Sequence, residues 1–212
     1  MPNLPITQLP SASALQPTNV FPVVQSGITK QSTFSQIIYS QGNSYGLFAQ
    51  TANSTPVTGT TTETTLINGG VGTLSVPANA FQIGDSFRAD FGGLLSSKNN
   101  DTIQIRIKTG AVILADSGPQ TMSASTDDVW QLSINFTIRA IGGAGVADIV
   151  SLGVFHTTKQ SNNTQGGFAF NTVNNTTFNT TINNTLEVTV QFSSNSTNNS
   201  IYSDIFVLNK IY

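Results

Sequence analysis

The chain has 212 residues, enough for one large all-β domain or for a smaller domain with an extension, and either can bury a hydrophobic core. Only 8% of the residues are charged and the formal net charge is −2, which argues against nucleic-acid binding because that function needs a basic surface to neutralise phosphates. Cysteine is absent, so disulfides and thiolate metal sites are excluded.

The low charge has a consequence for association. A surface built from Asn, Thr, Ser and Gln has little electrostatic protection against self-association, so we expect the protein to work in an assembly. The start of the chain has no basic segment followed by an apolar run, and no stretch approaches the roughly 18 to 20 apolar residues of a membrane span. We therefore expect a soluble protein made in the cytoplasm, without a signal peptide and without a membrane span.

Residues 1–45 differ from the rest of the chain. Five prolines, at positions 2, 5, 10, 17 and 22, predict extended backbone punctuated by turns. Helical spacing then follows, with Ser32 or Thr33 as N-cap and Gly42 just past the end, and predicts one short helix. Such a helix needs a partner surface, so a segment for anchoring and oligomerisation is favoured over a flexible leader. Its expected contact residues are Leu4, Leu9, Phe21, Val23, Val24, Phe34, Ile37 and Ile38.

Three runs in this segment resemble the amino-terminal segment of many phage and large-virus fibre and tail proteins. They are Leu4 to Pro10, Val20 to Lys30, and Thr33 to Ile38. The shared pattern is Leu-Pro, a spacer, Phe-or-Val-Pro-Val-Val-Gln-x-Gly-x-Thr-Lys, and a small polar helix. The resemblance implies a virion component whose front end anchors to other virion proteins of the capsid or tail.

A β pattern begins after this segment. Residues 46–50, 60–67 and 72–76 are expected to form short strands. In the next strand, Ser86 to Ser97, alternation places Phe87, Ala89 and Phe91 on the buried face. Gly92-Gly93 within it predicts a bulge or a close approach of backbones.

Two shorter strands are predicted next. Residues 101–108 alternate Ile103, Ile105 and Ile107 with polar side chains, which indicates one buried face. Residues 111–115 are expected to pair with them as a hairpin across the Thr109-Gly110 turn.

The strongest strand signal is Val129 to Ala140. Its even positions are apolar throughout and its odd positions are polar after Val129, as in a strand with one face in a core and one in water. The apolar set is Trp130, Leu132, Ile134, Phe136 and Ile138. Its length suits the middle of an extended sheet.

Three further regions complete the pattern. Residues 147–157 are apolar on both faces, which predicts burial on both sides or a subunit contact on one. The Asn- and Thr-rich tract 161–184 is interrupted by Phe168, Phe170 and Phe178, so strands or a long ordered loop are expected. Two last strands are predicted, one with Leu186 to Phe192 facing inward at alternate positions and one over residues 201–212.

These elements predict an all-β fold: an antiparallel jelly-roll β-sandwich over residues 46–212, preceded by the extended segment 1–45 with its short helix. The pattern from Thr60 to Leu208 resembles the tumour-necrosis-factor-like jelly rolls at the tips of viral and bacterial surface fibres. The resemblance implies a trimer packed through one aromatic-rich sheet, which would bury Phe155, Tyr202 and Phe206. The alternative, that these three side chains fill the core of one chain, stays open.

Residues with catalytic or metal-binding potential are few. His156 is the only histidine, and Asp127-Asp128 is expected to be a solvated turn before a strand and not a catalytic pair. Asn99 to Asp101 lacks the spacing of a calcium loop and is expected to form a hairpin turn. Gly142 to Gly145 precedes no crossover helix and is expected to be a hairpin tip. We expect no enzyme, no cofactor and no metal.

Two functional hypotheses follow. The first is a structural virion protein, a fibre, spike or capsid-decoration subunit, that assembles as a homotrimer, is anchored to the virion by its N-terminal segment and displays the jelly roll. The second is a module that binds a host receptor or glycan through exposed polar and aromatic groups.

Overall fold

The structure is a computed structural model that describes residues 19–33, 36–37, 45–68, 75–158 and 165–211. The chain divides into two units, Met1–Gln41 and Gly42–Tyr212. This division lies four residues before the boundary expected from the sequence. No helix in the described ranges has the length and apolar character that a membrane crossing requires.

The first unit contains a β-hairpin. Strands β1 (Val20–Gln25) and β2 (Ile28–Thr33) pair in antiparallel register across Ser26 and Gly27, which both have positive φ. The predicted extended backbone and turn are present in residues 20–33, but the prolines were also expected to break any regular element, and that part of the prediction is wrong here. Pro22 is tolerated because a two-stranded sheet has only edge strands.

The predicted N-cap of the short helix is confirmed at Thr33. The Thr33 hydroxyl accepts a hydrogen bond from Gln36 N at 3.2 Å, and the Gln36 side-chain oxygen accepts one from Thr33 N at 2.9 Å. This reciprocal pair is a capping box, which satisfies two backbone donors at a helix start. Gln36 and Ile37 are helical, whereas Phe34 and Ile38 lie outside the described residues.

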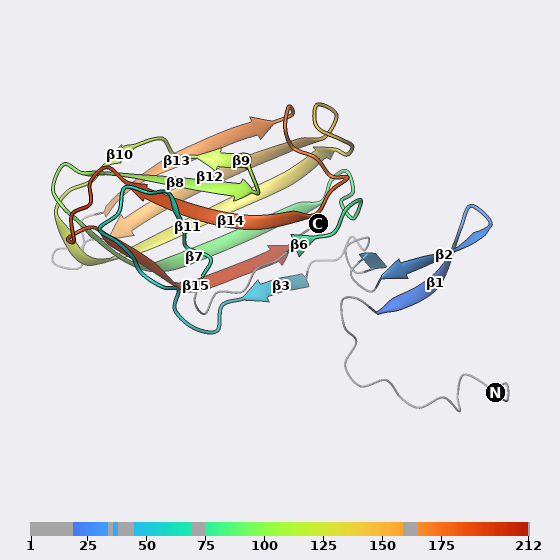
Figure 1. Ribbon diagram of the computed structural model, residues 1–212, viewed down its shortest axis with the longest axis horizontal. Coiled ribbons are helices and arrows are strands. Elements are labelled where there is room, and N and C mark those ends of the chain that lie inside the picture. Colours follow the sequence, from blue (N-terminus) through green and yellow to red (C-terminus); the bar gives the residue numbers. More distant parts are fainter. Residues whose placement is uncertain (1–18, 34–35, 38–44, 69–74, 159–164, 212) are drawn as a thin grey trace. The chain divides into compact units, whose positions relative to one another are not determined.

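The second unit is an antiparallel β-sandwich of two sheets (Figure 1). The larger sheet has the strand order β13-β12-β11-β7-β15-β3, with β4 on β15. Its strands are β3 (Tyr45–Ala49), β4 (Val57–Thr58), β7 (Ser86–Ser97), β11 (Ser125–Ala140), β12 (Asp148–Thr158), β13 (Gln165–Asn174) and β15 (Ser200–Lys210).

The smaller sheet has the order β10-β8-β14-β5, with β6 on β14 and β9 on β8. Its strands are β5 (Thr64–Thr65), β6 (Ser75–Val76), β8 (Thr102–Thr109), β9 (Val112–Asp116), β10 (Gln120–Thr121) and β14 (Asn184–Phe192). The all-β antiparallel sandwich expected from the sequence is confirmed.

The core lies between the sheets and follows the predicted alternation. On β11, the side chains of Trp130, Leu132, Ile134, Phe136 and Ile138 are buried, and the strand sits inside the sheet between β12 and β7. The three isoleucines of β8 are buried opposite them. The β8–β9 hairpin across Gly110 also forms as predicted.

A β-bulge in β15 changes the face on which its side chains lie. Pairing with β7 shifts between Ser203 and Ile205, so Ile201 and Ser203 are buried before the shift, and Phe206 and Leu208 after it. The sequence pattern placed Tyr202 and Phe206 on one face, which is wrong. An extra residue in a strand reverses the alternation beyond it.

Candidate functional site

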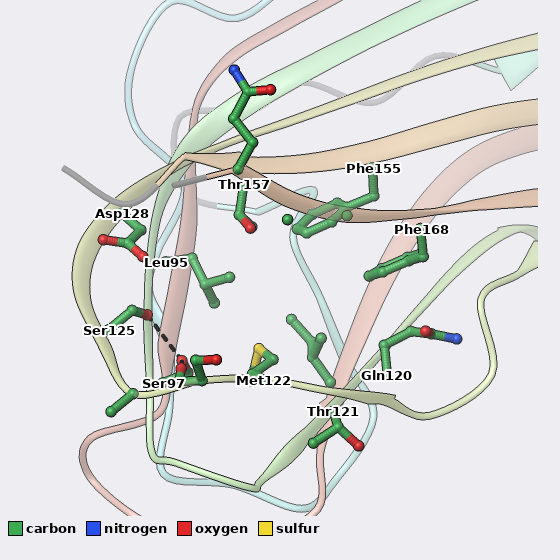
Figure 2. Close-up of a pocket in the computed structure, with 16 residues that line it drawn as sticks. Leu95, Ser97, Gln120, Thr121, Met122, Ser125, Asp128, Phe155, Thr157 and Phe168 are labelled. Carbon is green, nitrogen blue, oxygen red and sulfur yellow. Dashed lines mark hydrogen bonds between the residues drawn. The ribbon is translucent and has the colours of Figure 1, made fainter. Parts of the chain in front are cut away.

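A cavity of about 320 Å³ opens between the two sheets at one end of the sandwich (Figure 2). The larger sheet contributes residues from β7, β11, β12 and β13, and the smaller sheet contributes β8 and β10. The loop from Met122 to Ala124 lines the cavity between the ends of β10 and β11. A cavity of this size is within the range of small-ligand pockets.

The rings of Phe155 and Phe168 form one part of the lining. Trp130 on β11, Phe155 on β12 and Phe168 on β13 are stacked in sequence, with ring centroids 5.7 Å and 4.7 Å apart. Trp130 and Phe155 are buried, whereas Phe168 is half-buried and lies on the edge strand of the larger sheet. Figure 2 shows the rings of Phe155 and Phe168 beside each other at the cavity. The stack therefore ends in a ring that is held rigidly and is partly accessible.

Neutral polar groups form another part. The Ser97 hydroxyl donates to Ser123 O at 2.5 Å and lies 2.9 Å from the Ser125 hydroxyl. The Gln120 side-chain amide donates to Ser117 O at 2.5 Å, which holds that side chain against its own turn. Thr157, on β12, adds a further hydroxyl side chain. These groups present donors and acceptors without charge.

Among the described residues that line the cavity, Asp128 is the only charged one. It shares the buried face of β11 with Trp130 and is 7% exposed, so the prediction of a solvated turn is wrong for this residue. Asp127 is exposed at positive φ, within a register shift between Ser125 and Asp128. The Asp127 backbone N donates to the Ser96 hydroxyl at 3.0 Å, which fixes the shift.

A second hollow, of about 690 Å³, adjoins the first. Both are lined by Ser97, Ala124, Ser125 and Asp128. Its other side chains come from the end of β7 and the turn after it, from β11, and from the β14–β15 loop with the start of β15. They are Ser96, Lys98, Asn99, Thr126, Thr197, Asn198 and Ser200.

A buried network holds the loops under the second hollow. Asn199 is fully buried; its side-chain oxygen accepts from Lys98 N at 2.8 Å and its amide donates to the Asp101 carboxylate at 2.8 Å. Ser194 also donates to that carboxylate, and this hydrogen bond, followed by that of Asn199, lowers the pKa of Asp101. Asn99 to Asp101 therefore lies in a turn between β7 and β8 of different sheets, and the prediction of a hairpin turn is wrong.

Two of the three aromatic residues predicted for a trimer interface are buried within the chain. Phe155 and Phe206 are each 1% exposed in the single chain, so neither offers a surface to a second subunit. This burial agrees with the alternative that these side chains fill the core of one chain. Tyr202 is half-buried, and burial raises the pKa of its hydroxyl above the ordinary value of 10.0.

Of the predicted anchoring residues, Phe21, Val23 and Ile37 are half-buried and Val24 is 74% exposed. Leu4, Leu9, Phe34 and Ile38 are not among the described residues.

The remaining candidates for chemistry are dispersed. His156 is exposed on the outer face of β12, and the glycine run at 142–145 forms the predicted tip of the β11–β12 hairpin. Within the described part of the chain, no three His, Asp or Glu side chains come together as a metal site would require. The cavity itself was missed from the sequence, because its lining comes from six strands and a loop without a shared motif.

Comparison with known proteins leaves the chain without an assigned family. No protein-family model matches it, and no curated protein matches it. Among solved structures it is similar to the CBM2 module of the evolved Dit of Lactobacillus casei BL23 phage J-1, with a TM-score of 0.30 and 10% sequence identity. That similarity covers 66% of this chain and 68% of the module. A similarity at this TM-score and identity does not indicate the function of this chain.

Proposed function

We propose that the protein is a surface component of a virus particle and that its β-sandwich binds a saccharide in the cavity beside Phe168. The observation that carries the proposal is the pairing of a rigid, partly accessible aromatic ring with uncharged hydrogen-bonding side chains in one cavity. A sugar ring has an apolar face of C–H groups and a rim of hydroxyls, so it needs both kinds of surface. The composition supports this, because the polar surface comes mainly from neutral side chains.

The first unit supports attachment to a particle. Beyond the resemblance of its segments to fibre and tail proteins, the β1–β2 hairpin exposes Val20, Val24 and Ile28. Three large apolar side chains on one short hairpin are suited to burial against another protein. We therefore assign this unit the anchoring role, with other virion proteins of the capsid or tail as its partners and the virion as its location.

The strand order supports the proposal of a jelly roll of the tumour-necrosis-factor-like type. Without the β12–β13 hairpin and the strands β4, β6 and β9, which pair outside the main order, the sheets reduce to the orders β11-β7-β15-β3 and β10-β8-β14-β5. A jelly roll has eight strands in two such sheets, with its first and last strands adjacent in one of them. The β12–β13 hairpin then extends one sheet and brings Phe168 to its edge.

Replacing Phe168 with alanine should weaken saccharide binding by about tenfold, because a favourable ring contact contributes about 0.5 to 1.5 kcal/mol beyond its buried area. Gln120→Ala should also weaken it, by loss of a hydrogen bond. The measurement is calorimetric titration of the full chain with neutral saccharides identified on a glycan array. Thr172→Ala is the matched control, because Thr172 lies on the same strand but outside the cavity.

Two outcomes would contradict this function. If the wild-type protein binds no glycan on the array, the proposed saccharide-binding function is excluded. Equal affinities for wild type and both cavity variants would move binding to another surface. Thermal unfolding of each variant separates a loss of the site from a loss of the fold.

The outer face of the larger sheet favours a homotrimeric state alongside binding. Cross-strand register places five exposed apolar side chains on this face. They are Val129, Leu152, Val154, Val173 and Ile205. They replace the buried aromatic residues as candidates for the contact between subunits.

A charge on this face should dissociate the trimer. Wild-type protein is expected to sediment with three times the mass of one chain, and Leu152→Lys with Val154→Lys as a monomer, because buried like charges repel and are costly to desolvate. Ile182→Lys, at an exposed apolar position outside the sheets, should leave the mass unchanged. A monomeric wild type would exclude the trimer and leave the saccharide site intact.

A further inference from the structure

The two adjoining hollows define how much of a saccharide the protein contacts. They share four lining residues, so a ligand in the first cavity continues into the second without leaving the surface. The first hollow has an aromatic ring and the second has none. A chain of sugars can therefore be held by a ring contact at one end and by hydrogen bonds further along.

The side chains of the second hollow suit sugar hydroxyls. Hydroxyl and amide groups come from two separate loops and from the strand ends beside them. They belong to Ser96, Asn99, Thr197, Asn198 and Ser200. These two loops are tied together beneath the hollow by the buried Asn199 side chain and the Asp101 carboxylate. Because the loops are already fixed to each other, binding a ligand there costs little additional ordering of the backbone.

We propose that the binding site is an extended groove for an oligosaccharide, with one sugar at Phe168 and the following sugars over Asn198 in the second hollow. This inference rests on the proposed saccharide-binding function and adds the length of the ligand. It also assigns a binding role to the β14–β15 loop, which the sequence did not single out.

The test is a glycan array probed with the full-length wild-type chain. The array carries mono-, di- and trisaccharides of glucose, galactose, mannose and N-acetylglucosamine. We expect a trisaccharide to bind at least about tenfold more tightly than its monosaccharide, because added hydrogen bonds are made in the second hollow.

Two variants of the β14–β15 loop sharpen the test. Asn198→Ala should lower binding of the trisaccharide toward that of the monosaccharide and leave the monosaccharide unaffected. Asn195→Ala is the matched control, because Asn195 is exposed in the same loop but does not line either hollow. Phe168→Ala should weaken both ligands.

The outcomes distinguish this inference from the function on which it rests. Equal binding of mono- and trisaccharides, with no effect of Asn198→Ala, overturns the extended groove and leaves a single-sugar site. No binding to any sugar on the array overturns the proposed function and this inference together.

Discussion

Replacing Lys210 with methionine should lower the free energy of unfolding by about 3 to 5 kcal/mol, because it leaves the buried carboxylate of Asp85 without its cation. Lys210 Nζ lies 2.7 Å from Asp85 Oδ1, and the two side chains are 1% and 7% exposed. The other carboxylate oxygen accepts a hydrogen bond from Gln82 N at 3.0 Å. The methionine keeps most of the volume of the lysine side chain, so the loss reports the charge and not a cavity. Unfolding by urea measures this loss of free energy, and urea adds no salt that would screen the charges.

A double variant separates the contribution of the ion pair from the cost of burying one unpaired charge. Removing both charges, with Lys210→Met and Asp85→Leu together, should cost less than Lys210→Met alone, because no unpaired charge is then buried. Arg88→Met is the matched control: Arg88 and Asp90 form an ion pair on the same sheet, but their side chains are 53% and 37% exposed. That pair should contribute about 0 to 1 kcal/mol. A loss from Lys210→Met as small as that from Arg88→Met would mean that water reaches the Asp85 carboxylate.

Lys210 also shows where prediction from the sequence stops. Alternation correctly located β7 and β11 and their buried side chains, because those strands carry apolar residues at every second position over a long run. The same rule places a lysine or aspartate in water. Lys210 and Asp128 are buried because each follows the alternation of its own strand into the sandwich. Only the three-dimensional pairing supplies the partner of Lys210.

Two local features were not predicted, one despite a signal in the sequence and one without any such signal. The Ser26-Gly27 dipeptide between two runs of β-forming residues is typical of a hairpin turn, and it is the turn of the β1–β2 hairpin. The prolines outweighed it in the sequence-based prediction. The bulge at Asp204 has no comparable signal, because an extra residue is defined by the partner strand.

The candidate site was the least predictable part. Phe168 was recognised as an apolar residue within an Asn- and Thr-rich tract, but its role depends on stacking against Phe155 from a neighbouring strand. Ser97, Gln120 and Thr157 reach the same cavity from three separate strands of the two sheets. Sites for neutral ligands leave no charged or metal-binding pattern in a sequence, so only the fold brings their parts together.

The glycine pair in β7 was predicted to mark a bulge or a close approach of backbones, and Gly93 fits the second. A Cβ atom at this position would lie 2.0 Å from the carbonyl oxygen of Tyr202 and 2.9 Å from the Cα of Ser203. Across the same glycine, the indole N–H of Trp130 donates to the Tyr202 carbonyl at 3.0 Å. The missing side chain therefore lets three neighbouring strands join at one point beneath the aromatic stack.

Gly93→Ala should therefore destabilise the protein by about 3 kcal/mol or more, because overpacking against backbone adds to the loss of the Trp130 hydrogen bond. Urea unfolding measures the change, and the fluorescence of Trp130, the only tryptophan, reports whether the indole becomes solvated. Gly143→Ala is the control, because a Cβ atom there meets nothing within 4 Å, and its stability should match wild type.

Trp130→Phe keeps the prediction testable if Gly93→Ala does not fold. It retains a ring in the stack but has no N–H, so it should cost about 1 to 3 kcal/mol through the smaller ring and the unsatisfied Tyr202 carbonyl. Wild-type stability of Gly93→Ala would mean that β7 and β15 move apart at no cost. In that case the close approach at Gly93 would not be what holds β15 against the sheet.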